Sequence, residues 1–120
     1  MNRAFMFTSY FLKEWTRLGF TDEDQIRLEE MIRNNPQIGD VISGAGGFRK
    51  ARFAFEGRGK SGSARVIYLD IAEIAHVIFV DVYKKSEQAN LSQEKIVALA
   101  KVSKLLKGEE LWMRKDLQNF

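Results

Sequence analysis

The chain has 120 residues, a length that fits one domain with a single hydrophobic core. Its hydrophobic content of 45% is that of a folded protein, and it contains no apolar run as long as a transmembrane helix needs. The net charge is +3, and there are no cysteines, which excludes a disulfide framework and a thiolate metal site. The start of the chain lacks the pattern of a signal peptide, so we expect a cytoplasmic protein.

Basic side chains are concentrated in the middle and at the end of the chain. Residues 1–47 carry five Lys or Arg against seven Asp or Glu, residues 48–91 carry eight against five, and residues 92–120 carry six against four. A positive region of this kind is compatible with nucleic acid, an acidic protein or an anionic membrane surface as a partner.

The first third of the chain predicts a strand and two helices. Residues 4–8 form a short edge strand that leads into an amphipathic helix at residues 9–18, where apolar side chains recur at helical spacing. Thr21, with Asp24 three residues later, is the capping-box pattern that begins a second helix, and Pro36 limits its end. Because the connection is short, we expect an antiparallel helical hairpin.

The middle of the chain predicts sequential strands. A glycine-rich loop, residues 36–47, precedes three segments rich in β-branched and aromatic side chains. Those segments are residues 48–55, 64–72 and 75–83, and a hairpin loop at 56–63 joins the first two. We therefore expect a small antiparallel sheet of three to four strands, packed with the helical hairpin and a C-terminal helix, in the α+β class.

The end of the chain predicts one long helix. A polar connection at residues 84–90 precedes Ser92, which begins the helix, and Gly108 is expected to end it. The expected apolar stripe consists of Ile96, Leu99, Val102 and Leu106. Residues 109–120 are expected to be a short helix or a tail, and the whole chain, 1–120, a single domain.

A dense group of cations lies on the central hairpin, with Glu56 as the one acid among them. The cations are Arg49, Lys50, Arg52, Arg58, Lys60 and Arg65. Such a group repels itself, so it indicates a polyanion or an acidic partner. Alternation along the strand places Lys50 and Arg52 on one face and Arg49 on the other.

Antiparallel pairing brings Lys50, Arg52, Arg65 and Tyr83 toward one another if the predicted strands are neighbours. Arginine holds phosphate oxygens with two parallel hydrogen bonds, and lysine acts as a point charge, so the group suits a phosphate. A solvated outer sheet face, where lysine and arginine are common, is the alternative that composition leaves open.

Two glycine-rich segments fail as nucleotide-binding loops. The segment GKS at 59–61 resembles the end of a Walker A loop, but Ala54 stands where the first glycine is required, and a strand follows. The segment GAG at 44–46 lacks a third glycine, since Arg49 takes that place. His76 is the only histidine and has no cluster of ligand residues, so we expect a packed or hydrogen-bonded side chain and no metal or cofactor.

Two ordered segments resemble a known family. The runs GAGGFRKARFAFEGRGKSGSARVIYL and VYKKSEQANLSQEK are similar to the RelE/HigB superfamily of toxins from type II toxin–antitoxin systems, most closely to its HigB-like branch. The resemblance covers about residues 30–107. It implies a microbial-RNase-like sheet and a ribosome-dependent mRNA endoribonuclease, in which the ribose 2′-hydroxyl attacks the adjacent phosphate and cations stabilise the developing charge.

The resemblance also implies partners and site residues. The partners would be mRNA on the ribosome and a cognate antitoxin, a helix-turn-helix protein encoded next to the toxin, with operator DNA reached only through the antitoxin complex and no membrane. The implied catalytic residues are Lys50, Arg52, Arg65, Tyr83 and Lys85. The implied RNA-binding residues are Arg49, Arg58, Lys60 and Lys84.

The sequence departs from the RelE-type pattern after Lys85. RelE-type members place an arginine next and a tyrosine further on, whereas Ser86 stands here and the later tyrosine is missing unless Tyr83 substitutes. The general acid and base are therefore unassigned. A non-catalytic RNA-binding module and a protein-interaction subunit that use the same basic face remain as alternatives.

Overall fold

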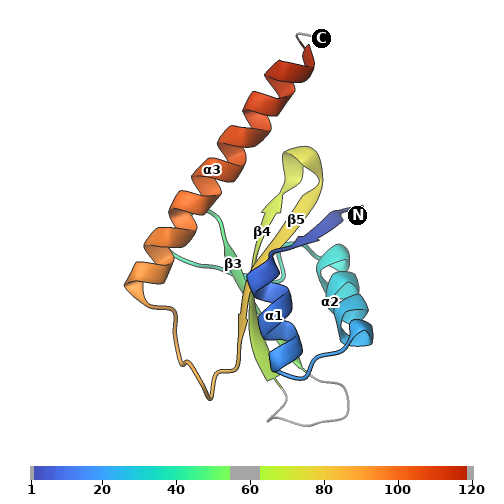
Figure 1. The fold of residues 1–120 in the computed structure, drawn as a ribbon, viewed down its shortest axis with the longest axis vertical. Helices are drawn as coiled ribbons and strands as arrows, with labels where there is room; N and C mark the ends of the chain where they lie inside the picture. The colour runs from blue at the N-terminus through green and yellow to red at the C-terminus, as the bar shows by residue number, and fades with distance from the viewer. Residues whose placement is uncertain (1, 55–62, 119–120) are drawn as a thin grey trace.

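The computed structural model describes residues 2–54 and 63–118, with side chains in the final helix described up to residue 108. A five-stranded sheet in the order β1-β5-β4-β3-β2 forms its centre (Figure 1). The strands are β1 (Ala4–Phe7), β2 (Asp40–Val41), β3 (Arg49–Ala54), β4 (Ser63–Ile71) and β5 (His76–Tyr83). The predicted α+β class is confirmed, and β3, β4 and β5 form the expected antiparallel meander.

The sheet differs from the expectation of three to four antiparallel strands in two ways. It has five strands, because β2 adds a two-residue pairing with β3, and both β2 residues are exposed and too few to show a pattern. It is also mixed, because β1 pairs with β5 in parallel. A parallel neighbour needs a long crossover, which here runs through the helices, and the composition of a four-residue strand does not reveal its distant partner.

Two helices follow β1, as predicted, and lie side by side on one face of the sheet (Figure 1). They are α1 (Ser9–Arg17) and α2 (Asp22–Asn34). The Thr8 hydroxyl accepts a hydrogen bond from the Phe11 amide at 3.1 Å and caps α1. The predicted capping box of α2 is confirmed, since the Thr21 hydroxyl accepts from the Asp24 amide while the Asp24 carboxylate accepts from the Thr21 amide.

The face below α1 and α2 holds an aromatic core. Trp15 of α1 stacks on Phe20 with ring centroids 4.1 Å apart and lies 5.6 Å from Phe53 of β3. Phe11 packs 5.5 Å from Phe79 of β5. Burying such rings supplies the largest apolar areas in a small domain, so this face carries the main hydrophobic stabilisation.

The opposite face is covered in part by the last helix, α3 (Gln93–Gln118). Leu99 is buried there, but Val102 is 38% exposed while Ser103 is 2% exposed, so the predicted stripe is wrong at one position. The prediction that Gly108 ends the helix is also wrong, because the backbone stays helical to Gln118 and a glycine inside a helix costs only about 1 kcal/mol. The C-terminal part of α3 runs past the sheet (Figure 1).

The connections complete the described chain. The connection between β4 and β5 is one turn of 3-10 helix, Ala72–Ile74, and Ala75 closes it with a positive φ of 54°. The hairpin loop predicted at 56–63 lies outside the described residues except for Ser63, which begins β4. Within the described part of the chain, no helix combines the length and the apolar character that crossing a bilayer requires.

Candidate functional site

Three of the predicted site residues lie in one row across the sheet. Arg52 of β3 is paired with Arg65 of β4, and Arg65 is paired with Tyr83 of β5. Residues directly opposite each other on neighbouring strands have Cβ atoms about 5 Å apart and point to the same face. We name these three residues the Arg–Arg–Tyr row. It faces the side that α3 partly covers, because Tyr83 packs in the cluster that contains Leu99.

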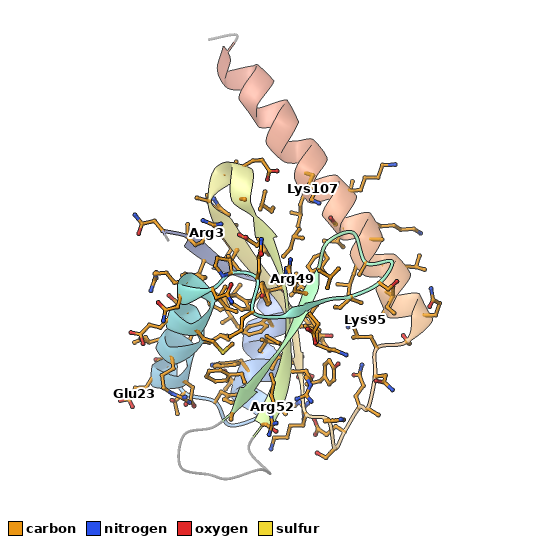
Figure 2. The ribbon with its side chains drawn as sticks, turned by 180° about the vertical axis from the view of Figure 1, so that it is seen from behind. Arg3, Glu23, Arg49, Arg52, Lys95 and Lys107 are labelled. Carbon is orange, nitrogen blue, oxygen red and sulfur yellow. The ribbon has the colours of Figure 1, made fainter. Side chains whose placement is uncertain are left out.

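The next row toward the centre of the sheet contains Lys50. Lys50 is paired with Ile67, and Ile67 is paired with Asp81. Lys50 therefore lies on the same face as Arg52, as strand alternation predicts, with the apolar Ile67 between it and the carboxylate. Figure 2 shows Arg52 further along β3 than Arg49 and Lys95 at the beginning of α3.

A β-bulge in β5 aims Tyr83 at the arginines. Tyr68 is paired with Phe79, but its neighbour Ile67 is paired with Asp81, so Val80 is an extra residue without a partner on β4. Phe79 points into the aromatic core, and without the bulge Tyr83 would share that face. Bulges often redirect side chains next to functional sites, and this one places both Asp81 and Tyr83 on the face of the Arg–Arg–Tyr row.

The Tyr83 hydroxyl has an unusual environment. The residue is only 5% exposed, and its hydroxyl has no hydrogen-bond partner among the described residues. Burial raises the pKa of Tyr83, the Asp81 carboxylate raises it further, and Arg65 opposes both. At neutral pH the hydroxyl is therefore a protonated donor without an acceptor. Leaving a buried polar group unpaired costs about 1–3 kcal/mol, so an incoming acceptor would be favoured.

Three cations of this face have no ion-pair partner among the described residues. Within residues 2–54 and 63–108, Lys50, Arg52 and Arg65 make no ion pair and no side-chain hydrogen bond. Lys50 and Arg65 are half-buried and Arg52 is exposed. Like charges directly opposite each other on neighbouring strands are destabilising, so an anion that bound between the two arginines would relieve the repulsion.

Arg49 lies on the other face and has a structural contact. Its guanidinium donates to the backbone oxygens of Gly39 at 2.8 Å and Gln37 at 3.4 Å. It thus holds the chain that follows α2 beside Tyr68, whose hydroxyl donates to Pro36 O and accepts from the Gly39 amide. The RNA contact that the resemblance implies for Arg49 stays a prediction.

The two lysines after Tyr83 lie on the connecting segment, residues 84–92. Lys85 is exposed and Lys84 is half-buried. The Lys84 carbonyl accepts hydrogen bonds from the amides of Glu87 and Gln88, and the Glu87 carboxylate pairs with the Arg17 guanidinium through two contacts of 3.1 and 3.2 Å. The connecting segment is therefore held against the end of α1. Arg58 and Lys60 lie outside the described residues.

His76 is hydrogen-bonded, as expected for a lone histidine. It is half-buried at the start of β5, at the other end of the strand from Tyr83, and its Nδ1 lies 2.6 Å from the Ile74 carbonyl oxygen. Among the residues whose side chains are described, no group of three His, Asp or Glu has the arrangement of a metal site.

Sequence reasoning missed one ion pair at this site. The Asp81 carboxylate, 3% exposed, lies 3.0 Å from the Lys95 ammonium of α3. A charge inside the apolar strand VIFVDVY was the available signal, because a buried carboxylate requires a partner. The partner was not identifiable, since Lys95 belongs to a helix whose position on the sheet no local sequence pattern reveals.

Comparisons with known proteins bear on the fold and the family of the chain. The family model for the RelE toxin of the RelE/RelB toxin–antitoxin system matches residues 7–118. A mutant of the E. coli toxin RelE in which two arginines are replaced by alanine, solved in the free state, matches with a TM-score of 0.55 and 20% identity. The match covers 83% of this chain and 95% of that chain.

The same mutant in complex with a peptide of the antitoxin RelB matches with a TM-score of 0.50 and 22% identity, over 76% and 97% of the two chains. These likenesses support the fold, and the narrower resemblance to the HigB-like branch stays a prediction. Because the family model spans nearly the whole sequence, the chain belongs to the family of RelE toxins of RelE/RelB toxin–antitoxin systems.

Proposed function

We propose that this toxin is a ribosome-dependent endoribonuclease that cleaves mRNA and thereby stops translation. The observation that carries the proposal is the Arg–Arg–Tyr row, in which Tyr83, with a hydroxyl that has no partner among the described residues, lies opposite Arg65, and Arg65 lies opposite Arg52. Neither arginine has an acid partner among the described residues. Two cations and a hydroxyl donor match the oxygens of one phosphate group.

The reaction that fits this row is transesterification at the phosphate. The ribose 2′-oxygen attacks the adjacent phosphorus, the bond from phosphorus to the 5′-oxygen breaks, and a 2′,3′-cyclic phosphate and a 5′-hydroxyl are formed. The 2′-hydroxyl loses one proton and the 5′-oxygen gains one. Arg52 and Arg65 stabilise the negative charge on the non-bridging oxygens, a task in which preorganised donors are most effective.

Tyr83 supplies a proton donor in this scheme. Because burial and Asp81 raise the pKa of Tyr83, the hydroxyl remains protonated at neutral pH and donates to the phosphate or to the departing 5′-oxygen. Lys50, one row away, adds positive charge on the same face. The residue that accepts the 2′-proton is not assigned.

The surrounding cations bind the RNA backbone in this proposal. Lys84 and Lys85 on the connecting segment take the nucleotides next to the cleaved bond, and Arg58 and Lys60 of the hairpin loop contribute further contacts. Contacts of this kind depend on salt concentration, because each neutralised phosphate releases counterions.

A cognate antitoxin is the proposed protein partner. The support is the family's toxin–antitoxin pairing and the solved complex of a RelE mutant with a RelB peptide. We expect the antitoxin to be a helix-turn-helix protein encoded next to this chain, with operator DNA bound only through their complex. Both proteins would act in the cytoplasm, where the ribosomes are.

Substitution of Arg65 tests the proposed function. Purified toxin is added to an in vitro translation reaction, and cuts in the mRNA are mapped by primer extension. We expect codon-positioned cuts with the wild type and a loss of roughly 10²–10³-fold in rate for Arg65→Ala, the usual effect of removing one donor to a developing oxyanion. A fully active Arg65→Ala protein would show that the site is elsewhere.

Arg33→Ala is the matched control for that experiment. The Arg33 guanidinium lies 4.9 Å from the centre of the Phe5 ring, on an element that packs against the other face of the sheet. Its removal deletes the same charge without touching the Arg–Arg–Tyr row, so cleavage should be retained. Circular dichroism of all three proteins separates loss of activity from loss of fold.

The second candidate function is RNA binding without cleavage. It is favoured by one observation: Asp81, two residues before Tyr83 on the same face, is already paired with Lys95, so it is not a ready general base. This alternative predicts salt-dependent RNA binding with no cuts. A protein-interaction subunit predicts neither cuts nor salt-dependent RNA binding.

A further inference from the structure

The ion pair between Asp81 and Lys95 lies at the point where β5, the connecting segment and α3 meet. Asp81 is two residues before Tyr83 on the same face, and Lys95 belongs to the first turns of α3. We propose that Asp81 and Lys95 are positioning residues whose ion pair fixes the Tyr83 hydroxyl and the connecting segment against the two arginines. The proposal rests on the proposed function and adds two residues to it.

The position of Asp81 argues for a role beyond stability. A carboxylate that is 3% exposed has lost its hydration, and the attraction to a partner repays that loss only with good geometry. Apolar residues of similar size are usually at least as stabilising at such a place. The neighbouring positions on this face, Ile67 and Ile78, show that the sheet accepts aliphatic side chains there. An acid is therefore not needed for packing.

Lys95 joins three elements through one ammonium group. Its Nζ lies 3.0 Å from the Asp81 carboxylate of β5 and 5.2 Å from the centre of the Tyr10 ring of α1. Both contacts are attractive, the second through the negative face of the ring. The first turns of α3 are thereby held at the edge of the sheet, where the chain returns from the connecting segment.

The connecting segment is consequently fixed at both ends and in the middle. It leaves β5 directly after Tyr83, returns to the sheet at Lys95, and is tied to α1 by the pair of Glu87 with Arg17. Lys84 and Lys85 lie inside this closed stretch. If the Asp81–Lys95 pair were lost, the beginning of α3 and the lysines would be free to move relative to the Arg–Arg–Tyr row.

The ion pair also sets the electrostatic environment of Tyr83. The sheet register and the ion pair place Arg65 of β4, Arg52 of β3, Asp81 of β5 and Lys95 of α3 around the phenol, and Lys84 follows Tyr83 in the chain. Asp81 is the acid in this set, and Asp40 of β2 lies further along the same face, opposite Lys50. The Asp81 carboxylate disfavours the phenolate, which adds to the effect of burial on the pKa of Tyr83 and opposes the effect of Arg65.

The test compares Asp81→Asn with Asp70→Asn. Asp70 lies on β4, where alternation turns it to the opposite face, and its carboxylate is 2.8 Å from the Arg3 guanidinium, with side chains 13% and 10% exposed. Each variant therefore removes a largely buried carboxylate that pairs with one cation, but only Asp81→Asn alters the environment of Tyr83. The ionisation of the three tyrosines is followed by NMR on protein labelled with ¹³C at Tyr Cζ, with Tyr83→Phe to assign the signal.

We expect Asp81→Asn to lower the pKa of Tyr83 and to reduce kcat for cleavage of ribosome-bound mRNA at least about tenfold, with KM little changed. Asp70→Asn should alter neither quantity, and Asp81→Glu should restore part of kcat. Lys95→Met retains the carboxylate, so it should reduce kcat without lowering the pKa of Tyr83. A merely structural ion pair would give the same result for Asp81→Asn and Asp70→Asn, which would overturn the proposal.

Two further outcomes remain informative. If Asp81→Asn does not fold, the double variant Asp81→Asn with Lys95→Met, which leaves no unpaired charge, is tested with the same expectations. If the wild-type protein cuts no mRNA, the proposed function fails, and the inference is decided by the tyrosine titration alone. An unchanged pKa of Tyr83 then overturns the inference, and a lowered pKa supports it.

Discussion

Two buried tyrosine hydroxyls on neighbouring strands have opposite surroundings. The Tyr68 hydroxyl donates to Pro36 O at 2.8 Å and accepts from the Gly39 amide at 3.0 Å, so it closes the chain that follows α2 onto the sheet. The Tyr83 hydroxyl has no partner among the described residues. One hydroxyl therefore contributes to stability, and the other is a cost that binding of an acceptor would remove.

Removing each hydroxyl separates the two roles. Tyr68→Phe should lower the free energy of unfolding by about 1–3 kcal/mol, because a buried carbonyl and a buried amide lose their partner. Tyr83→Phe should leave the free energy of unfolding unchanged within about 0.5 kcal/mol or raise it, while mRNA cleavage falls. Urea unfolding of the two variants measures both changes. Equal destabilisation by both substitutions would mean that Tyr83 has a structural partner.

The residues of the site were partly predictable because strand alternation is local. It placed Lys50 and Arg52 on one face and Arg49 on the other, as the structure has them. The bulge at Val80 was not predictable, since an extra residue in a strand has no signature in a run of apolar side chains. The partner of Asp81 was equally hidden, because ion pairs between distant elements depend on packing that no local pattern encodes.

At the scale of elements, α3 is attached to the loop that precedes β3, and Gly46 is the loop residue closest to the helix. The Ser103 hydroxyl donates to the Gly46 carbonyl at 2.5 Å, and the Lys107 ammonium lies 3.3 Å from the same oxygen. Gly46 has a φ of +68°, and a methyl group there would lie 2.8 Å from Ser103 Cβ. Glycine is thus required at this position both for the backbone and for the contact.

Alanine at two glycine positions tests this attachment. Gly46→Ala should lower the free energy of unfolding by about 2 kcal/mol or more, from the strained backbone and the overlap with Ser103. Gly108→Ala is the control, at a position inside α3 where no atom lies within 4 Å of the added carbon. It should stabilise the protein by up to about 1 kcal/mol, since alanine favours helix. Thermal unfolding followed by circular dichroism checks both signs.

The helices were the most predictable elements, and the reason is chemical. Capping side chains act within three residues, so the beginning of α2 was deduced from Thr21 and Asp24, whereas α1 was predicted from apolar side chains at helical spacing. The end of α3 was not deducible, because Gly108 is tolerated inside a helix at small cost. The strand β2 is defined only by its two-residue pairing with β3, so its own sequence does not predict it.

At the scale of the molecule, the two faces of the sheet differ in composition. The face under α1 and α2 is an aromatic core, and the opposite face combines a smaller apolar cluster with the Arg–Arg–Tyr row. From the sequence alone, the sign and position of the charges indicated a polyanion or an acidic partner. The mixture of parallel and antiparallel strands could not be predicted, because β1, the first strand in the chain, pairs with β5, the last one.

Alkaline pH should destabilise the folded protein through its buried tyrosines. Burial raises the pKa of both Tyr68 and Tyr83 above the ordinary value of about 10. Between that value and the raised one, the unfolded chain has lost the phenolic proton and the native protein has not. The contribution of these tyrosines to the free energy of unfolding is therefore fully present below about pH 10. It is lost as the pH rises through their pKa in the folded protein.

Urea midpoints measured from pH 8 to 11 test this dependence. Above about pH 10, the urea midpoint should fall less steeply with pH in the double variant Tyr68→Phe/Tyr83→Phe than in the wild type. Lysine deprotonation is common to both proteins, so the difference between the two slopes comes from the tyrosines. Parallel curves for the two proteins would contradict the expected contribution of the tyrosines.

The pairing of β1 with β5 has a consequence for the newborn chain. The first strand is completed only by the last, and even the Thr8 side chain reaches a carbonyl 72 residues away, that of Val80. Contacts so distant in sequence form late, because closing the intervening chain has to precede any gain from them. A polypeptide still in synthesis has neither a covered aromatic core nor an assembled row of cations. The toxin therefore cannot become active until the ribosome has made nearly the whole chain.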